Sequence, residues 1–344
     1  MVIGLLLILV LVLALPFIFK IVEHNLEVFL FIMGLSAVII SGAISLYLFE
    51  EILTNTFLYL ITAAVLISGI LFKIFKKSIT TGVNKVLKHI PLNIFVMLII
   101  IIVGLASSII TAIIASLLLV EILNVLPLER KQKINLNIIA CFSIGLGAVL
   151  TPVGEPLATV VVSRLNADFF YLLNEIGIYV IPCVFVLGLV GLLYVNKFNK
   201  NAQSISSTKE FTNEDETYKE GFIRTGKVFI FVFALELLGT GFKPLIENYI
   251  IHLDSRLLYW INMISSVLDN ATIASAEISS KMTSVQIQAI LMGLLISGGM
   301  LIPGNIPNII SAGKLKIKSN EWARLGVPMG LIIMAVYFVI MFII

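Results

Sequence analysis

The chain has 344 residues, of which 59% are hydrophobic and only 12% are charged. Apolar runs of about 18 residues or more recur from end to end and leave no room for an ordinary soluble domain, which predicts a polytopic membrane protein. The net charge of +3 comes from basic residues gathered in a few loops, where they indicate topology, so we expect no nucleic-acid partner.

Three spans are predicted first, at 2–19, 26–48 and 55–72. The first two, within residues 1–50, are expected to be peripheral helices. By the positive-inside rule the loop after the third span is cytoplasmic, which places the N-terminus outside. The basic residues of this loop are Lys73, Lys76, Lys77, Lys85 and Lys88.

The next apolar stretch, Pro91–Leu126, is too long for one span and has basic residues close to both ends. Its middle carries Ser107, Ser108 and Thr111. Because both flanks are expected in the cytoplasm, the stretch predicts a re-entrant hairpin with its tip near the middle of the membrane. A tilted helix is the alternative.

A broken helix is predicted over 135–165, with its break at Thr151–Pro156. The two prolines of this break remove backbone N–H groups, so nearby carbonyls and amides are left outside the helical ladder. At membrane depth such backbone must line a cavity. The break also holds Glu155, and a carboxylate inside a span is by default a functional-site hypothesis, because a buried charge costs roughly 3 kcal/mol or more.

A return span at 171–195 completes a first unit over residues 51–195, and the polar segment 196–221 predicts a cytoplasmic linker. The same order then repeats over residues 222–344, and basic residues before the last span place the C-terminus outside. The elements of this second unit are a span at 222–242, a hairpin at Leu257–Ile278, a broken helix at 284–312 interrupted at Pro303–Asn308, and a span at 326–344.

The predicted fold is therefore all-α, with about eight spans, two re-entrant hairpins and two Pro-broken helices arranged as inverted-topology repeats. Short matches between the units support the repeat: Pro152 and Pro156 with Pro303 and Pro307, Gly147 with Gly298, and IIAS at 113–116 with TIAS at 272–275.

Glu155 and Asp269 are the two carboxylates at predicted interruptions, one from each unit. Sodium and lithium are hard ions that prefer oxygen ligands, and a proton could compete with them for the same carboxylate. We therefore expect a sodium site at these residues. Further oxygen donors are expected from Thr151, Asn270, Asn305 and Asn308, and from Ser107, Ser108 and Thr111 at the hairpin tip.

Each of these assignments has a structural alternative. Glu155 could pair with a backbone amide or with Arg164, and Asn305 and Asn308 could serve only to satisfy turn backbone. Glu236, midway along an apolar run, could be a proton relay or could pair between helices.

Other function classes lack support in the sequence. The chain contains no GxxxxGK[ST] motif for ATP, no HExxH motif for zinc and no nucleophile–base constellation, so we expect neither an enzyme nor a cofactor. Cys141 and Cys183 lie in apolar stretches and are expected to be buried and unpaired.

Two motifs resemble those of a known group of transporters. The segment GLGAVLTPVGEPLATVV at 145–161 resembles the Pro-Ile-Gly-Asp type motif of NhaD-type sodium/proton antiporters, with Glu155 at the acidic position. SSVLDNATIAS at 265–275 is similar to the Leu-Asp-Asn motif that these antiporters share with arsenite permeases of the ion transporter superfamily. The chain is also similar to a poorly characterised prokaryotic group described as predicted cation transporters.

The resemblance covers about residues 90–344 in arrangement and implies a hairpin-plus-broken-helix fold, commonly dimeric, with substrate sites at the hairpin tips and breaks. A homodimer is therefore a candidate assembly in the cell membrane. The chain is shorter than typical members, and Ile110-Thr111 stands at the first hairpin tip where the second has Asp269-Asn270.

Three functions follow as hypotheses. The first is a secondary transporter that exchanges sodium or lithium for protons. The second is a sodium- or proton-coupled anion carrier of the arsenite or dicarboxylate type, in which helix N-termini hold the anion. The third is a channel.

Overall fold

The computed structural model describes the chain except residues 20, 23, 24, 57, 60, 61, 64, 65, 68, 69, 71–81, 83, 84, 88, 200–217 and 267–269. In the described part all regular structure is helical, as predicted. Four helices are long and apolar enough to cross a membrane, and shorter apolar helices accompany them, which is compatible with a membrane-embedded protein. The four are α6 (Leu92–Ile110), α10 (Tyr171–Asn199), α11 (Tyr218–Asn248) and α16 (Ser319–Phe342).

The N-terminal part differs from the prediction in one respect. Helix α1 (Val2–Ile18) fits the first expected span, but the second, 26–48, is interrupted: α3 (Leu26–Ser41) ends at Gly42, and α4 (Leu46–Thr54) follows. Gly42 has φ +75°, a left-handed conformation that ends the helix. The apolar content of the segment does not predict this helix end at Gly42. Much of the expected third span, 55–72, lies outside the described residues.

The first hairpin and the first broken helix are both interrupted where the sequence indicates. Helix α6 ends at Ile110, α7 (Ala112–Val125) follows directly, and Thr111 is the turn. The broken helix consists of α8 (Arg130–Ala148) and α9 (Pro156–Leu165). It begins five residues earlier than expected, because Glu129 and Gln132 form a capping box.

The second set of elements has the same order. The structure here consists of η1 (Ile250–His252), α12 (Ser255–Ile261), η2 (Asn262–Ser266), α13 (Asn270–Glu277), α14 (Ser284–Gly298), η3 (Ile302–Gly304), α15 (Ile306–Leu315) and α16. The expected linker, 196–221, is helical at both ends, within α10 and α11, and its residues 200–217 are outside the described part.

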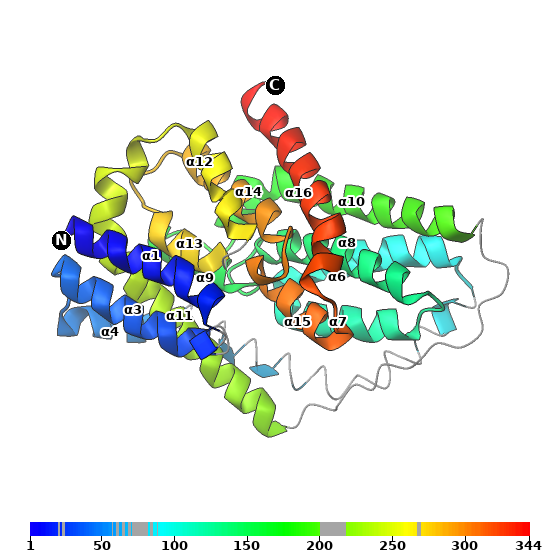
Figure 1. The fold of residues 1–344 in the computed structure, drawn as a ribbon, viewed down its shortest axis with the longest axis horizontal. Coiled ribbons are helices and arrows are strands. Elements are labelled where there is room, and N and C mark those ends of the chain that lie inside the picture. Colours follow the sequence, from blue (N-terminus) through cyan, green and yellow to red (C-terminus); the bar gives the residue numbers. More distant parts are fainter. Residues whose placement is uncertain are drawn as a thin grey trace.

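The helices form two groups (Figure 1). On one side α1, α3 and α4 accompany α11, and α11 packs along α3. Phe233 of α11 joins Val38 and Leu48 in a separate apolar cluster at this side. The other group contains α6, α7, α8, α10, α15 and α16, and α9 and α13 contact α11 of the first group.

The two sets of elements are interlocked crosswise. Helix α9, the second part of the first broken helix, packs on α13, the last helix before the second broken helix. Reciprocally, α15 packs on α7, which closes the first hairpin. The long helices show the same crosswise packing, since α16 of the second set contacts α8 of the first, and α10 of the first set contacts α14 of the second.

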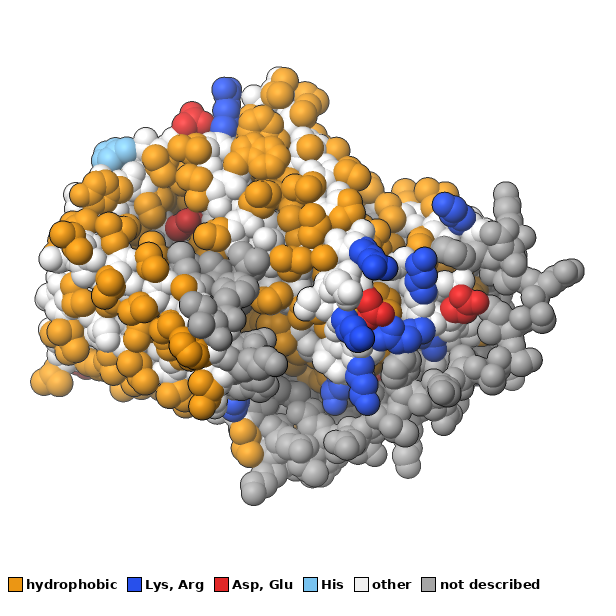
Figure 2. All heavy atoms as spheres, viewed as in Figure 1, with side chains coloured by type: hydrophobic (Ala, Val, Ile, Leu, Met, Phe, Trp, Pro, Cys, Tyr) orange, Lys and Arg blue, Asp and Glu red, His pale blue; other side chains and the backbone are white. Residues whose placement is uncertain are grey.

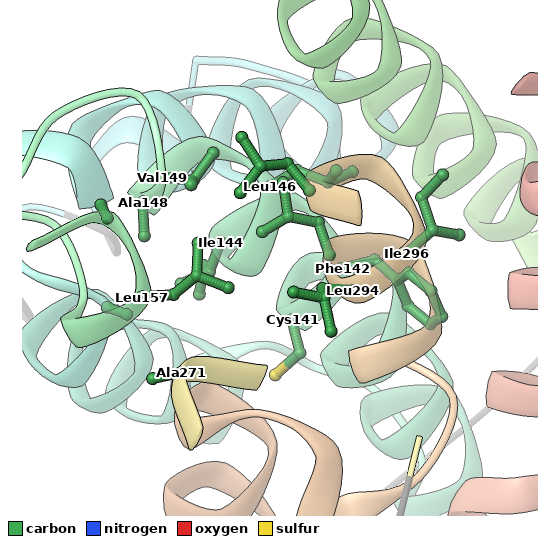
Figure 3. Close-up of a cluster of buried hydrophobic side chains, with 14 of the residues drawn as sticks. Cys141, Phe142, Ile144, Leu146, Ala148, Val149, Leu157, Ala271, Leu294 and Ile296 are labelled. Atoms are coloured by element: carbon green, nitrogen blue, oxygen red, sulfur yellow. The ribbon is translucent and has the colours of Figure 1, made fainter. Parts of the chain in front are cut away.

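The main apolar core lies where these elements cross. Figure 3 shows side chains of α8, among them Phe142, Ile144 and Leu146, converging with Leu157 of α9 and Leu294 of α14. Burial of side chains of this size contributes about 1.5–3 kcal/mol each. The core therefore holds α8 and α9, on either side of the first interruption, against α14 of the second broken helix.

The face drawn in Figure 2 carries many hydrophobic side chains among its described residues. Exposed hydrophobic side chains cover the outer faces of α10 and α16, including Phe185, Leu193 and Ile332, as expected for helices that face lipid. Lys and Arg side chains gather over α7 and α15 in the same view. We call this region the basic end. Arg130 there lies 2.7 Å from Glu321 and donates to the carbonyl of Lys316 at 2.9 Å.

Candidate functional site

The tip of the first hairpin docks on the gap between α8 and α9, residues 149–155, which we call the first break. The Ala112 N–H donates to the carbonyl of Gly154 at 2.8 Å, and the Thr151 hydroxyl donates to the carbonyl of Ser108 at 2.5 Å. Ser107 donates to the carbonyl of Ile144, near the end of α8, at 3.0 Å. The expected tip residues and the expected break are thus brought together.

Glu155 ends the first break as the N-cap residue of α9. Its backbone is extended, with φ −157° and ψ 160°, and only 2% of the residue is exposed. Pro156 occupies the first position of α9, where its missing N–H costs no helical hydrogen bond. The backbone therefore places a carboxylate in the protein interior, where the C-terminal end of α8 and the N-terminal end of α9 meet.

Thr111 at the hairpin tip has an unusual backbone conformation. Its φ is +75° and its ψ is 149°, a region that β-branched residues rarely occupy. The hydroxyl of Thr111 accepts the N–H of Ile114 at 3.4 Å and so caps α7. A strain of about 1–3 kcal/mol is expected there, at the position where the hairpin meets the first break.

The gap between α14 and α15, residues 299–305, is the second break, and Asn305 ends it as the N-cap residue of α15. Asn305 is 1% exposed, and its Oδ1 has no hydrogen-bond partner among the described residues. Its amide nitrogen lies against Gly145 of α8, where a Cβ would overlap it. The second break thus reaches into the body of the first broken helix.

Asn308, in the first turn of α15, combines the two roles considered for it. Its Nδ2 donates to the carbonyls of Gly298 at 2.8 Å and Leu301 at 2.9 Å, which is the turn role. Its Oδ1 has no hydrogen-bond partner in the described part of the chain, so this oxygen remains available as a ligand. Thr159 plays the corresponding turn role at the first break, donating to the carbonyl of Pro152 at 2.7 Å.

The two breaks share their backbone geometry. The helix before each ends at a C-cap with φ near −70°, the N-cap residues are both extended, and the helix after each ends in the left-handed region. The matching pairs are Val149 with Gly299, Gly154 with Gly304, Glu155 with Asn305, and Asn166 with Lys316.

This pairing corrects the predicted alignment by one residue. The match of Pro152 and Pro156 with Pro303 and Pro307 is displaced, since Pro156 opens α9 at its first position whereas Pro307 is the second residue of α15. Neither position requires a backbone donor, so a proline can shift by one residue without changing the cap.

The second hairpin is only partly described. Ser265 of η2 donates to the carbonyl of Leu294 at 3.3 Å, as Ser107 does to Ile144 in the first set. Asn270 begins α13 and is buried. Asp269 lies outside the described residues, so its role stays a prediction.

Glu236 lies away from the breaks, in α11, and pairs with the far end of α9. Its Oε2 is 3.6 Å from Nη2 of Arg164, and the same Nη2 donates to the Glu236 carbonyl at 2.6 Å. Asn55 donates to the Glu236 carboxylate at 3.3 Å. Along α9, Arg164 is about 13 Å from Glu155 at 1.5 Å per residue. Of the two roles predicted for Glu236, pairing between helices is the one for which the structure provides a partner.

A second group of polar residues, between α8 and α15, was not among the predicted site residues. Asn137 donates to Ser311 Oγ at 2.9 Å, and Cys141 Sγ lies 3.2 Å from the same oxygen. Both cysteines are free and buried, as predicted. The available signal was the spacing of four between Asn137, Cys141 and Gly145, which places them on one face of a helix.

The donors collected at the two breaks are almost all oxygens. The described residues contain no group of three or more His, Cys, Asp or Glu side chains that could hold a transition metal. Neither break contains a basic residue. A buried carboxylate, amide oxygens and the carbonyl ends of α8 and α14 suit a small hard cation instead.

Comparison with known proteins gives one family match. Residues 2–344 match the family described as "Protein of unknown function (DUF1646)". No curated protein matches the chain.

Proposed function

The chain belongs to the DUF1646 family of proteins of unknown function, and we propose that it is a secondary active transporter that exchanges sodium or lithium for protons. One observation carries the proposal: Glu155 is buried at a helix break on which a hairpin tip is docked. In the proposed cycle this carboxylate holds a proton and a cation in alternation, and access to it alternates between the two sides of the membrane.

The donor set supports a cation more than an anion. Glu155 contributes the one carboxylate of the two breaks, and the Oδ1 atoms of Asn305 and Asn308 have no partner among the described residues. The partly buried guanidinium of Arg164 is paired with the carboxylate of Glu236. An anion in this place would face Glu155 without a compensating basic side chain from either break.

The crosswise contacts support inverted repeats. We infer that the hairpin, broken helix and long helix of the first set correspond to those of the second, because α9–α13 mirrors α15–α7 and because the cap geometries agree. Hairpins and broken helices of opposite orientation that meet at the middle of the membrane are a common transporter plan. The resemblance to NhaD-type antiporters stays a prediction.

Loop positions support the proposed orientation. The ends of α6 and α10 are joined by a 2.8 Å hydrogen bond between Asn93 and Asn196, and Arg130 reaches the α15–α16 connection. All these loop ends are expected in the cytoplasm, together with the 196–221 linker. In this arrangement both termini lie on the outer side of the cell membrane.

The test is cation-driven proton movement in proteoliposomes. Purified protein is reconstituted in acid-loaded vesicles, and internal pH is followed after external sodium, lithium, potassium or choline is added. We expect alkalinisation with sodium or lithium, and its loss in Glu155→Gln. The matched control is Glu121→Gln, which changes a half-buried carboxylate on α7 and should leave exchange intact.

The remaining outcomes separate the alternatives. Exchange that persists in Glu155→Gln would overturn the site assignment. No response of the native chain to any cation would favour the anion carrier. Flux that neither saturates nor exchanges would favour a channel.

A further inference from the structure

The contact between α8 and α15 has polar groups at successive levels from the breaks to the basic end. We call this contact the seam. At its inner end Asn305 lies against Gly145, and one turn further Cys141 lies 3.7 Å from the carbonyl of Pro307. Another turn on, Asn137 donates to Ser311.

The two helices run antiparallel along the seam. Because Asn137, Cys141 and Gly145 are each four residues apart, they rise in steps of about 6 Å along one face of α8. Beyond Asn137 the seam reaches the basic end, where Arg130 donates to the carbonyl of Lys316 at 2.9 Å. The line of polar groups thus runs from the second break to Asn137. One turn further along the same face of α8, the buried Lys133 donates to the carbonyl of Asn124 at 3.0 Å, and Arg130 lies at the basic end.

Three amide oxygens in or next to the seam have no hydrogen-bond partner among the described residues: Oδ1 of Asn137, of Asn305, and of Asn308, whose Nδ2 is bonded to the carbonyl of Gly298 at the end of α14. All three side chains are buried. A buried polar atom without a partner costs about 1–3 kcal/mol, and a ligand that reaches these oxygens would recover that cost.

The equivalent positions in the other set are apolar. By the pairing of the breaks, Asn137 and Cys141 correspond to Ile287 and Leu291 of α14, and Ser311 corresponds to Val161 of α9. The polar residues of α8 and α15 thus have apolar counterparts at the matching positions of α14 and α9.

We propose that the seam is the passage by which the cation moves between the breaks and the basic end, with Asn308, Ser311 and Asn137 as successive oxygen donors. This inference rests on the proposed function, since it presupposes a transported cation. The chemical class of the ligand is a small monovalent cation that exchanges part of its water shell for amide and hydroxyl oxygens.

Cys141 provides a native probe inside the seam. Its Sγ lies 3.2 Å from Ser311 Oγ, and Cys183 can be removed by Cys183→Ala. Ag⁺ is a monovalent cation that displaces the proton of a thiol to form an S–Ag bond, so it should enter with the transported ion, react with Cys141 and inhibit exchange. In proteoliposomes of the Cys183→Ala protein we expect inhibition by Ag⁺ applied at the basic end. Sodium at ten times its Kd should slow this inhibition about tenfold, because it leaves about a tenth of the sites free.

The control for the probe is Cys141→Ala in the same background, in which the exchange that remains, whatever its rate, should resist Ag⁺. Inhibition that sodium does not slow would mean that Ag⁺ and the transported ion use different routes, and it would overturn the proposal. Continued exchange with no inhibition by Ag⁺ would also overturn it while leaving the proposed function intact. If the native chain shows no cation-dependent exchange at all, both proposals fail.

A pair of serine substitutions gives an independent measurement. Ser311 and Ser143 are both fully buried, but Ser143 donates to the carbonyl of Ile100 in α6 at 2.9 Å and lies outside the seam. Ser143→Ala removes one donated hydrogen bond, whereas Ser311→Ala also leaves the buried Nδ2 of Asn137 without its acceptor, so the melting temperatures of the two variants are compared before their rates. We expect Ser311→Ala to lower the maximal exchange rate about tenfold or more, equivalent to 1.36 kcal/mol of barrier, with Ser143→Ala within about twofold of native. Equal rates for the two variants would contradict the passage.

Discussion

The first and second breaks have nearly the same backbone but different side chains. Glu155 and Asn305 are both extended N-cap residues, one a carboxylate and the other a neutral amide. If the backbone alone determined the chemistry, the two residues would be interchangeable. The comparison indicates that the fold provides two equivalent positions and that the sequence places a charge at only one of them.

The helices that follow the breaks differ in the same way. Each has a basic residue in its last turn, Arg164 in α9 and Lys314 in α15. Arg164 is partly buried and paired with Glu236 of α11, whereas Lys314 is exposed. The first broken helix is thus held by charge to the peripheral group of helices, and the second ends at the basic end.

The strongest test of the comparison moves the carboxylate from one break to the other. Glu155→Asn alone should reduce cation-driven proton exchange by about 1,000-fold, equivalent to ~4 kcal/mol, because no carboxylate remains in either break. Adding Asn305→Glu should restore about a tenth of native exchange, since the equivalent backbone presents the new carboxylate to the same interior. Exchange is measured as internal alkalinisation in proteoliposomes.

Asn305→Glu alone is the control for this swap. We expect it to impair exchange, because two buried carboxylates would then repel each other. A double variant that folds with the native melting temperature but stays as inactive as Glu155→Asn would show that the two positions do not serve one site.

The next largest effect is expected at the other end of α9. Glu236→Leu leaves the partly buried Arg164 without its carboxylate and should cost about 3 kcal/mol of stability. Adding Arg164→Met should recover part of this loss, because the uncompensated charge is removed. Thermal unfolding of the detergent-solubilised protein measures both.

The conservative variant Glu236→Gln separates pairing from proton relay. If Glu236 only holds α9 to α11, exchange should persist in folded Glu236→Gln protein. Loss of exchange without loss of stability would favour the relay role.

A smaller effect is expected where the second break enters the first broken helix. The Cβ of Gly145→Ala would overlap the amide of Asn305, and overpacking of this kind costs about 1–3 kcal/mol. Gly313→Ala on α15 is the matched control, since nothing lies within 4 Å of a Cβ there and helix propensity should favour alanine. Similar melting temperatures for the two variants would contradict the close approach of Asn305 to α8.

The smallest expected effect is at the first hairpin tip. Thr111→Gly should relieve the strain at φ +75° and raise stability by about 1 kcal/mol, less whatever the lost cap on Ile114 contributed. Asn166→Gly, at φ 48°, should change stability by only a few tenths of a kcal/mol, because asparagine tolerates this region. Destabilisation by Thr111→Gly would mean that the cap outweighs the strain.

The interruptions were predictable from sequence because their causes are local. Two prolines and a glycine within six residues predicted the first break within a few residues of its observed position. The hairpin turn near Thr111 was expected from the length of the apolar stretch, its basic flanks and the small polar residues in its middle. Single prolines such as Pro182 and Pro244 lie inside helices and gave no such signal. Glu155 could be singled out because its surroundings in the sequence are so apolar.

Features that depend on contacts between distant segments could not be predicted. The pairing of Glu236 with Arg164, the seam from Asn137 to Ser311 and the crosswise packing all join residues far apart in the chain. The one-residue displacement of the prolines belongs here too, because helix caps decide the alignment and a proline is accepted at either of two positions.

The crosswise packing has a consequence for how the protein is made. Helix α7 leaves the ribosome early, but its partner α15 is synthesised only after about 190 further residues, which at 5–20 residues per second takes roughly 10–40 s. During that interval the face of α7 that will contact α15 has no helix packed on it. This face and the hairpin tip beside it are exposed either to lipid or to the proteins that insert the chain into the membrane. Biogenesis of this chain should therefore be slow and sensitive to translation rate, in contrast to a membrane protein whose helices pair in the order in which they emerge.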